Sequence, residues 1–296
     1  MASTTTKPAL NTSVPTPSNP STLPPRFAIR RLEPKHSPWA AAIVMHSNLY
    51  HSPVWPIVYP TAITARLHKG MKSAAYLVDH QINSGMSFGV FDTEYAFKRP
   101  ESAQQGGKLW WDETEPSVQE AAGPEAESAR LLAQMDFPLV SVALSYDAID
   151  PLDMARMAAL IDTLPLFGEL YHHLEILDPR APADWKPDAA RQVLMRNATS
   201  TRRDYEEHHL MSGTARWLMR EAAAEGYRGV QIEALHDKVA WVWSHPEEPF
   251  RGSVVSQVDM ATFVDEEGKK VFEPATQTGS KIFVHLKPAG GENGGT

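Results

Sequence analysis

The sequence predicts a single α/β domain, because short apolar runs of strand length alternate with longer segments whose apolar residues repeat at helical spacing. The clearest run is Phe137–Leu144 (FPLVSVAL), which is almost wholly apolar, as a buried central strand would be. The clearest helix covers 210–225 and is followed by Gly226, a natural C-terminal cap. A chain of 296 residues that is 42% hydrophobic can bury one large core, so nothing requires a second domain.

The other strands and helices are predicted from the same two patterns, apolar runs of strand length and apolar residues at helical spacing. The Asn83-Ser84-Gly85 turn marks the end of one helix, and Asp150-Pro151 marks the start of another, since proline is tolerated in a first helical turn. In chain order we expect strands at 27–32, 87–91, 137–144, 192–195, 229–235, 253–258 and 281–286, and helices at 39–49, 63–82, from 151 to about 161, 166–177, 210–225 and 237–244.

Both ends of the chain are poor in apolar residues. Residues 1–25 are mainly Ser, Thr and Pro, and residues 289–296 are rich in Gly. Such segments cannot offset the entropy lost on ordering by burying apolar surface, so we expect both to be disordered, with a folded domain at 26–288. Residues 99–129 are rich in Gly, Gln, Glu and Pro, and we expect a long, partly mobile surface excursion there.

Composition excludes several classes of protein. The net charge is −8 and no Lys/Arg-rich run is present, so we expect no nucleic-acid partner. The absence of cysteine excludes disulfides, thiolate nucleophiles and cysteine-based zinc sites. The longest apolar run is too short to cross a bilayer, and the N-terminus lacks the features of a signal or transit peptide. We therefore expect a cytoplasmic protein with no membrane partner.

The last third of the chain has a distinctive order: helix, Gly-capped turn, strand, short helix, strand. The residues that carry it are Tyr205–Met211 (YEEHHLM), Leu218-Met219, Glu225–Glu233 (EGYRGVQIE) and Asp237–Ala240 (DKVA). This pattern resembles the core of the GNAT (N-acetyltransferase-like) superfamily of acyltransferases, over roughly residues 26–286 with insertions at about 96–136 and 147–190. The resemblance implies an α/β (α+β) fold with a mixed central sheet flanked by helices.

In that family, a loop with an Arg or Gln and two small residues holds the pyrophosphate of acetyl-CoA at a helix N-terminus. Counting back from Gly226 places Glu206 at the Arg/Gln position, and His209 and Met211 at the glycine positions. A second register uses Gly213 and Ala215 as the small residues and puts Leu210 at the Arg/Gln position. The acyl-CoA contacts that the resemblance implies are His209, Leu210, Met211, Ser212 and Gly213, with Asn197 on the pantetheine arm.

The resemblance and the strand ends together supply the catalytic candidates. Glu233, on the strand that borders the family's acyl site, would be a base for an amine proton, with His236 beside it. His208 adjoins two carboxylates and could shuttle protons near neutral pH. Tyr146 and Asp147 follow the buried strand, where polar residues often line a cleft. The family's acidic Tyr falls on Trp243, whose indole cannot serve as an acid.

The sequence thus predicts an acyl-CoA-dependent N-acyltransferase that acts on a small molecule. Its cofactor would be acetyl-CoA or another acyl-CoA. We expect no metal, because the adjacent His172 and His173 would point to different faces of a helix. The alternative is the same fold without CoA binding, which would either catalyse acid–base chemistry on an apolar metabolite or act as a non-catalytic binding protein.

Overall fold

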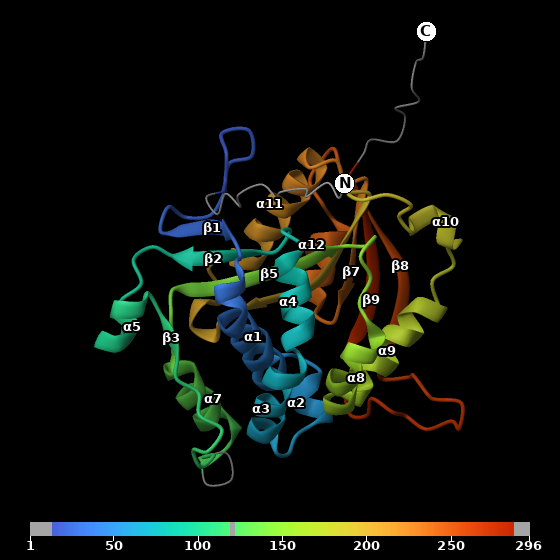
Figure 1. The fold of residues 1–296 in the computed structure, drawn as a ribbon. Helices are drawn as coiled ribbons and strands as arrows, with labels where there is room; N and C mark the ends of the chain where they lie inside the picture. The colour runs from blue at the N-terminus through green and yellow to red at the C-terminus, as the bar shows by residue number, and fades with distance from the viewer. Residues whose placement is uncertain (1–13, 119–121, 287–296) are drawn as a thin grey trace, which may run out of the picture.

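One mixed sheet runs through the whole molecule. The computed structural model describes residues 14–118 and 122–286, in which seven strands join in the order β1-β2-β5-β6-β7-β9-β8 (Figure 1). All neighbouring pairs are antiparallel except β6 and β7, which run parallel. The predicted α/β class with a mixed central sheet flanked by helices is confirmed.

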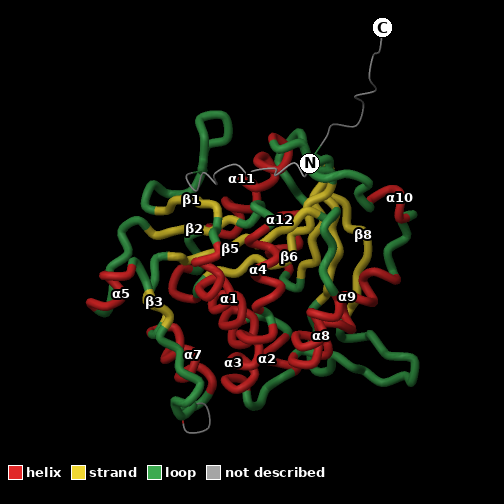
Figure 2. Tube along the Cα trace, viewed as in Figure 1, coloured by secondary structure: helices red, strands yellow, loops and turns green. Residues whose placement is uncertain are grey.

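The elements have the following bounds. The main sheet consists of β1 Phe27–Arg31, β2 Phe88–Asp92, β5 Leu139–Asp147, β6 Val193–Thr201, β7 Gly229–Ala234, β8 Arg251–Asp259 and β9 Thr278–His285, and a separate pair consists of β3 Lys108–Leu109 and β4 Met135–Asp136. The helices are α1 Ser37–His46, α2 Trp55–Val58, α3 Ile63–Ser73, α4 Ala75–Asn83, α5 Pro100–Gln105, α7 Pro124–Ala133, α8 Met154–Thr163, α9 Pro165–Ile176, α10 Pro182–Trp185, α11 Leu210–Ala224 and α12 Asp237–Ser244. Figure 2 separates these elements from the loops by colour.

Helices cover both faces of the sheet. Helices α1 and α4 lie in front of it in Figure 1, and α11 and α12 lie behind. Strand β5 is buried from Leu139 to Tyr146 because its two faces serve two cores. Leu139 and Val142 belong to the core under α1, whereas Val140 and Ala143 belong to the core under α11. The prediction of a buried central strand is confirmed.

The sheet opens between β6 and β7. The two strands pair only from Val193 with Gly229 to Arg196 with Ile232, although β6 continues to Thr201. On its other side β6 stays paired with β5, where a bulge leaves Asn197 as an extra residue between Arg196 and Ala198. Within the described residues, one edge of β6 beyond Arg196 therefore has no partner strand, and the open end of the sheet begins there.

The N-terminal segment differs from the expectation of disorder at 1–25. Residues 1–13 lie outside the described part, but 14–25 pack along α11. The buried Asn19 donates from Nδ2 to the Glu221 carboxylate (2.9 Å) and accepts at Oδ1 from Arg220 Nε (2.9 Å), while Trp217 Nε1 donates to its backbone oxygen (3.1 Å). Hydrogen bonding, which the apolar content of the segment does not reveal, fixes it in place.

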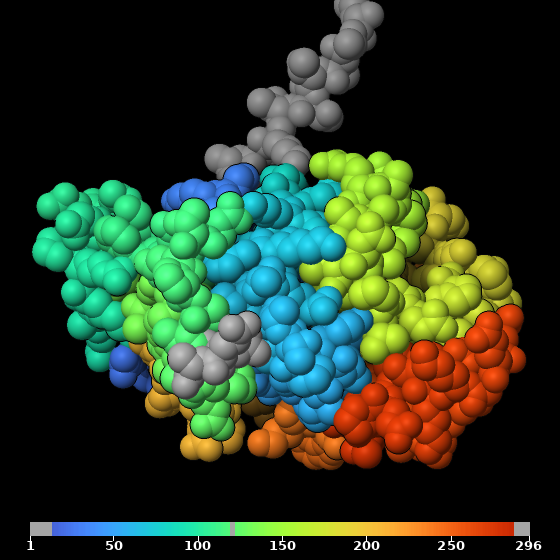
Figure 3. Space-filling model, turned by 90° about the horizontal axis from the view of Figure 1, so that it is seen from below, coloured from blue at the N-terminus to red at the C-terminus, as the bar shows by residue number. Residues whose placement is uncertain are grey.

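The expected excursion at 99–129 also differs from prediction. It forms α5, β3 and the start of α7, and only 119–121 lie outside the described residues. The carboxylate of Glu127 is fully buried and accepts hydrogen bonds from Thr64 Oγ1 (2.9 Å) and Arg130 Nε (2.8 Å). On the face seen in Figure 3, the green α7 region lies beside the blue and cyan α2–α4 region. Polar composition here reflects an ion-paired helix rather than a mobile loop.

Two helix predictions need smaller corrections. The helix expected at 63–82 turns at Ala74, so that α3 packs against α8 and α4 packs against β5. The helix expected from Pro151 begins at Met154 instead, because the Asp153 side chain accepts hydrogen bonds from the first-turn amides. Within the described residues, no helix combines the length and the apolar character needed to cross a membrane.

Candidate functional site

A cavity of about 790 Å³ lies where β6 and β7 separate. It is continuous through the opening of the sheet and has three parts. One end is formed by the loop before α11 and the start of α12, the middle by β6, β7 and α9, and the other end by α1, the segment after it, α4 and α8. A single space therefore connects the two faces of the sheet.

The first end is built around the N-terminus of α11. Leu210, Met211 and Ser212 form the first turn of the helix and line the cavity. Their amides have no partner within the helix, and the N-cap residue His209 provides no side-chain cap. An uncapped helix N-terminus carries a partial positive charge and attracts anions. This end of the cavity therefore suits a phosphate group.

The loop that leads into α11 has an unusual backbone. Glu207 and His209 have φ values of 70° and 57°, the left-handed region that favours glycine. Glu206 forms an ion pair with Arg203, and both side chains line the cavity. Lys238 contributes a further cation to the same end. The carboxylate of Glu206 is thus neutralised locally, which reduces its repulsion of an anion.

The middle of the cavity holds three polar side chains, of which Arg196 is buried and Glu233 and Tyr171 are half-buried. Glu233 projects from β7, Arg196 from β6 and Tyr171 from α9. Burial is the main reason why the pKa of Glu233 is raised, and Lys281 and Gln231 act in the opposite direction. Burial also raises the pKa of Tyr171, and the charge of Glu233 adds to that shift. The carboxyl and the phenol are therefore both biased toward their protonated forms.

Asn197 lies at the bulge of β6, between the α11 end and the middle of the cavity. Its Oδ1 accepts a hydrogen bond from Nε2 of the fully buried Gln81 on α4 (2.9 Å). The side chain is thereby fixed against the wall of the cavity. Among the residues that the structure describes, the β6 backbone beyond Asn197 has one edge without a partner strand, so its peptide groups can bind an extended chain that carries amides.

The other end of the cavity is apolar. It is lined mainly by aliphatic and aromatic side chains from α4, α8 and α9: Leu77, Val78, Leu160, Leu164 and Phe167. Such a chamber favours the apolar part of a small molecule over a charged group.

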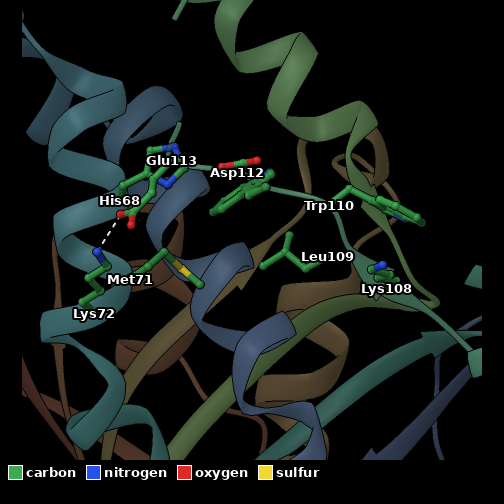
Figure 4. A pocket seen from close by; sticks show the side chains of 9 residues that line it. His68, Met71, Lys72, Lys108, Leu109, Trp110, Asp112 and Glu113 are labelled. Carbon is green, nitrogen blue, oxygen red and sulfur yellow. Dashed lines mark ion pairs between the residues drawn. The ribbon is translucent and has the colours of Figure 1, made fainter. Parts of the chain in front are cut away.

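A second hollow of about 510 Å³ lies on the surface between α3 and β3 (Figure 4). Its charged groups already interact within the hollow. Lys72 pairs with Glu113 (2.6 Å), and Lys108 lies 3.8 Å from the centre of the Trp110 ring. The buried polar groups of the sheet opening make the larger cavity the candidate site.

Comparison with solved structures identifies the fold. The C-terminal condensation domain of Ebony, in complex with beta-alanyl-dopamine, superposes with a TM-score of 0.57 at 12% identity, over 88% of this chain and 99% of that one. Arylalkylamine N-acetyltransferase 2 from Aedes aegypti superposes with a TM-score of 0.53 at 9% identity, over 88% and 99%. The chain has the GNAT fold. No protein-family model matches the sequence, and no curated protein matches it either.

The GNAT-fold cavity brings together most of the residues that the sequence singled out. Glu233 and His236 line it, as do Asn197 and four residues around the start of α11: His209, Leu210, Met211 and Ser212. His236 is also the N-cap of α12, and its Nδ1 accepts a hydrogen bond from the Lys238 amide (3.2 Å). A histidine that accepts at Nδ1 carries its proton on Nε2.

Three predicted catalytic residues lie elsewhere. His208 does not line the cavity, and its ring packs 5.6 Å from that of Phe27 on β1. Tyr146 is buried against His80, with ring centres 5.2 Å apart. Asp147 accepts a hydrogen bond from the Arg191 amide (2.6 Å). The end of β5 that carries Tyr146 and Asp147 pairs with the start of β6, the end away from the opening. None of the three lines the cavity, and their catalytic roles stay predictions from the sequence.

Gly213, a predicted cofactor residue, does not line the cavity. A Cβ atom there would lie 2.4 Å from Cδ2 of Leu23. The glycine makes room for the N-terminal segment, and its role toward a cofactor stays a prediction. Among the loop positions at which the family uses glycine, the structure shows a left-handed backbone at His209, whereas Met211 is an ordinary helical residue.

Sequence reasoning missed two polar residues of the cavity. Tyr171 lies on a helix of the expected insertion, where no motif marks it. Arg196 follows the predicted strand 192–195, and a charged residue at the end of an apolar strand was the available signal. Trp243 does not line the cavity; it is fully buried and its ring lies 5.4 Å from the guanidinium of Arg196.

Proposed function

We propose that this GNAT-fold protein transfers an acyl group from an acyl-CoA thioester to the nitrogen of a small amine. The observation that carries the proposal is the single cavity that joins an uncapped helix N-terminus to the half-buried carboxylate of Glu233 through the opening of the sheet. Acyl-CoA, when bound, supplies the reactive thioester. The amine would enter from the apolar chamber on the opposite face.

The first end and the middle of the cavity fit the parts of an acyl-CoA in order. The first-turn amides of α11 and Lys238 would hold phosphate groups. The unpaired edge of β6 beyond Arg196 would bind the amides of the pantetheine arm, with Asn197 at the bulge. The uncapped amides and the unpaired strand edge are observations of this chain that favour such a ligand.

Glu233 is the proposed base. An amine is protonated near neutral pH and must lose a proton to become an acyl acceptor. The raised pKa of Glu233 makes its carboxylate a stronger base than an exposed glutamate, and the group is ionised only above that pKa. Glu233 takes one proton from the ammonium group, and the neutral nitrogen then bonds to the acyl carbon. The second proton that the nitrogen loses as the amide forms replaces the proton that the acid gives to the sulfur.

Tyr171 is the proposed acid. The carbon–sulfur bond breaks as the new amide forms, and the sulfur must be protonated. The Tyr171 phenol lines the same part of the cavity, and its raised pKa keeps it protonated. Tyr171 gives its proton to the sulfur, a task that Trp243 cannot perform.

The names of the structural neighbours support an amine as the acceptor. One is an arylalkylamine N-acetyltransferase, and the other is a condensation domain bound to beta-alanyl-dopamine. The apolar chamber of this chain would accommodate the apolar part of such an amine.

Steady-state assays with acetyl-CoA and a panel of amines test the proposal. We expect free CoA to be released in step with N-acetylated product, and Glu233→Gln to reduce kcat/KM by about 10²- to 10⁴-fold. Glu94→Gln is the matched control, since Glu94 is exposed and outside the cavity. Acetyl-CoA binding without turnover of any amine would favour a binding protein, and absence of binding would favour CoA-independent chemistry.

A further inference from the structure

Lys281 is a buried lysine that lies directly across from Glu233. Strands β7 and β9 pair in antiparallel register with Glu233 opposite Lys281. Their strand neighbours Ile232 and Ile282 belong to the core under α11, so both charged side chains project to the other face of the sheet, on which α9 packs. Side chains directly opposed in this way have Cβ atoms about 4.5–5.5 Å apart, and opposite charges so placed attract each other.

The ammonium group of Lys281 nevertheless binds Asp178. Its Nζ lies 3.1 Å from Oδ2 of Asp178, with 4% and 3% of the two side chains exposed, and no ion pair joins Lys281 to Glu233 within the described residues. Arg180 fixes the Asp178 carboxylate by donating to both of its oxygens (3.0 and 2.7 Å). Arg180 also donates to Gln231 on β7 (2.9 Å). The lysine is therefore held at Asp178 rather than at the residue that it faces.

Lys281 is the cation that acts on Glu233 most directly. Burial raises the pKa of Glu233, and the charge of Lys281 opposes that shift. Arg196 pairs in register with Ile232 and so faces α12, where its guanidinium lies 5.4 Å from the Trp243 ring centre. The position of the Lys281 ammonium group therefore determines how strongly the Glu233 carboxylate is stabilised. The titratable groups on the elements around Glu233 are Tyr171 and Glu175 on α9, Asp178 and Arg180 after it, Arg196 on β6, His236 and Lys238 at α12, and Lys281 on β9.

We propose that Asp178 is a positioning residue for the Glu233 base: it holds and neutralises the ammonium group of Lys281, and so leaves Glu233 to accept a proton from the acyl acceptor. The inference rests on the proposed function, because Asp178 acts through the proposed base. A lysine that paired with Glu233 would stabilise the carboxylate and weaken it as a base. Neither Asp178 nor Lys281 lines the cavity, so both act on Glu233 from behind.

Titration of the Glu233 carboxyl in the ligand-free protein tests the inference without any substrate. Nuclear magnetic resonance of the full chain, labelled with ¹³C at the glutamate carboxyl carbons, follows each group, and the signal missing from Glu233→Gln identifies Glu233. We expect Asp178→Asn to release Lys281 to Glu233 and to lower the pH at which Glu233 titrates by about 1 pH unit or more. Asp178→Asn/Lys281→Met should return that pH toward the wild-type value, because the released cation is gone.

A matched control and a second variant complete the test. Glu113→Gln should leave the titration of Glu233 unchanged, since Glu113 also pairs with a lysine, Lys72, but at the surface hollow. A thermal melt establishes that each variant is folded. If Asp178→Asn does not fold, Lys281→Met decides, because it keeps Asp178 paired with Arg180. Glu233 should then titrate at a pH no lower than in the wild type, and a fall would overturn the inference.

The remaining outcomes separate this inference from the proposed function. An unchanged or higher titration pH in Asp178→Asn would overturn the inference, as would a double variant that titrates like Asp178→Asn. In an active enzyme, the low-pH limb of kcat/KM should move with the titration of Glu233, and a limb unchanged by Asp178→Asn would also count against it. The expected titration shifts without transfer to any amine would instead refute the proposed function and leave the role of Asp178 toward Glu233 standing.

Discussion

Asn19 is predicted to anchor the N-terminal segment to α11. The substitution Asn19→Ala removes a side chain that is 5% exposed and makes hydrogen bonds with Glu221 and Arg220, both at 2.9 Å. It leaves the backbone contact with Trp217 in place. The perturbation therefore tests the polar contacts of the segment without deleting it.

The expected loss of stability follows from those contacts. A hydrogen bond to a charged group contributes about 1.5–3 kcal/mol, but Arg220 and Glu221 are half-buried and regain water when Asn19 is removed. We therefore expect Asn19→Ala, which removes both hydrogen bonds, to lower the free energy of unfolding by about 2–3 kcal/mol. For a domain of this size, about 2–4 °C of melting temperature is lost per kcal/mol, so Tm should fall by about 4–12 °C.

Differential scanning calorimetry of the full chain measures this effect. Ser18→Ala is the matched control, because Ser18 is exposed and its hydroxyl contacts only that of Thr16. We expect the control to melt within about 1–2 °C of the wild type, as surface substitutions do. If Asn19→Ala melted at the temperature of the control, the segment would not be anchored as described.

Four further predictions concern the middle of the cavity. The kcat/KM profile should fall as pH drops through the raised pKa of Glu233, at a higher pH than for an exposed glutamate, and Glu233→Gln should remove that limb. The pKa of Glu233 is higher in the folded than in the unfolded protein, so its carboxyl is neutral and costs no stability at low pH, but its ionisation destabilises the fold at high pH. Glu233→Gln should therefore raise Tm at pH 8 and leave it unchanged at pH 4. Tyr171→Phe should reduce kcat about 100-fold or more with little change in KM, and an unchanged kcat would exclude Tyr171 as the acid. Arg196→Met should raise the Tm of the ligand-free protein because it removes an unpaired buried charge, and a large decrease would mean that the cation is already compensated.

The sequence was sufficient for the elements whose periodicity is strong. Strand β5 and helix α11 could be predicted because each buries a regular pattern of apolar residues. The resemblance also located Glu233 and the loop before α11, because their spacing from Gly226 is short and contains no insertion.

The remaining features depend on contacts between distant segments. Tyr146 and Asp147 do not line the cavity, and the sequence could not predict this because it does not show which end of β6 separates from β7. Asn19 looks like part of a polar tail until α11 supplies its partners. Tyr171 enters the cavity only through the packing of α9 against β8 and β9. None of these has a local signature.

The backbone of the loop before α11 determines which substitutions in that loop best test binding of acetyl-CoA. Glu207 and His209 are the residues with left-handed backbone, whereas Met211 is helical and Glu206 is paired with Arg203. Glycine at 207 and 209 should relieve strain of about 1–2 kcal/mol per residue and remove one carboxylate from the mouth of the cavity. Ala62→Gly is the control, because Ala62 has a φ of 51° but lies outside the cavity.

Calorimetric titration of acetyl-CoA tests the central claim, that this GNAT-fold cavity binds an acyl-CoA. The account predicts saturable binding by the wild type, unchanged binding by Ala62→Gly, and about five-fold tighter binding by the Glu207→Gly/His209→Gly variant, because loss of the Glu207 carboxylate removes about 1 kcal/mol of repulsion from the phosphates. Absence of binding by both the wild type and the double variant at millimolar acetyl-CoA, with both proteins folded, would contradict the account.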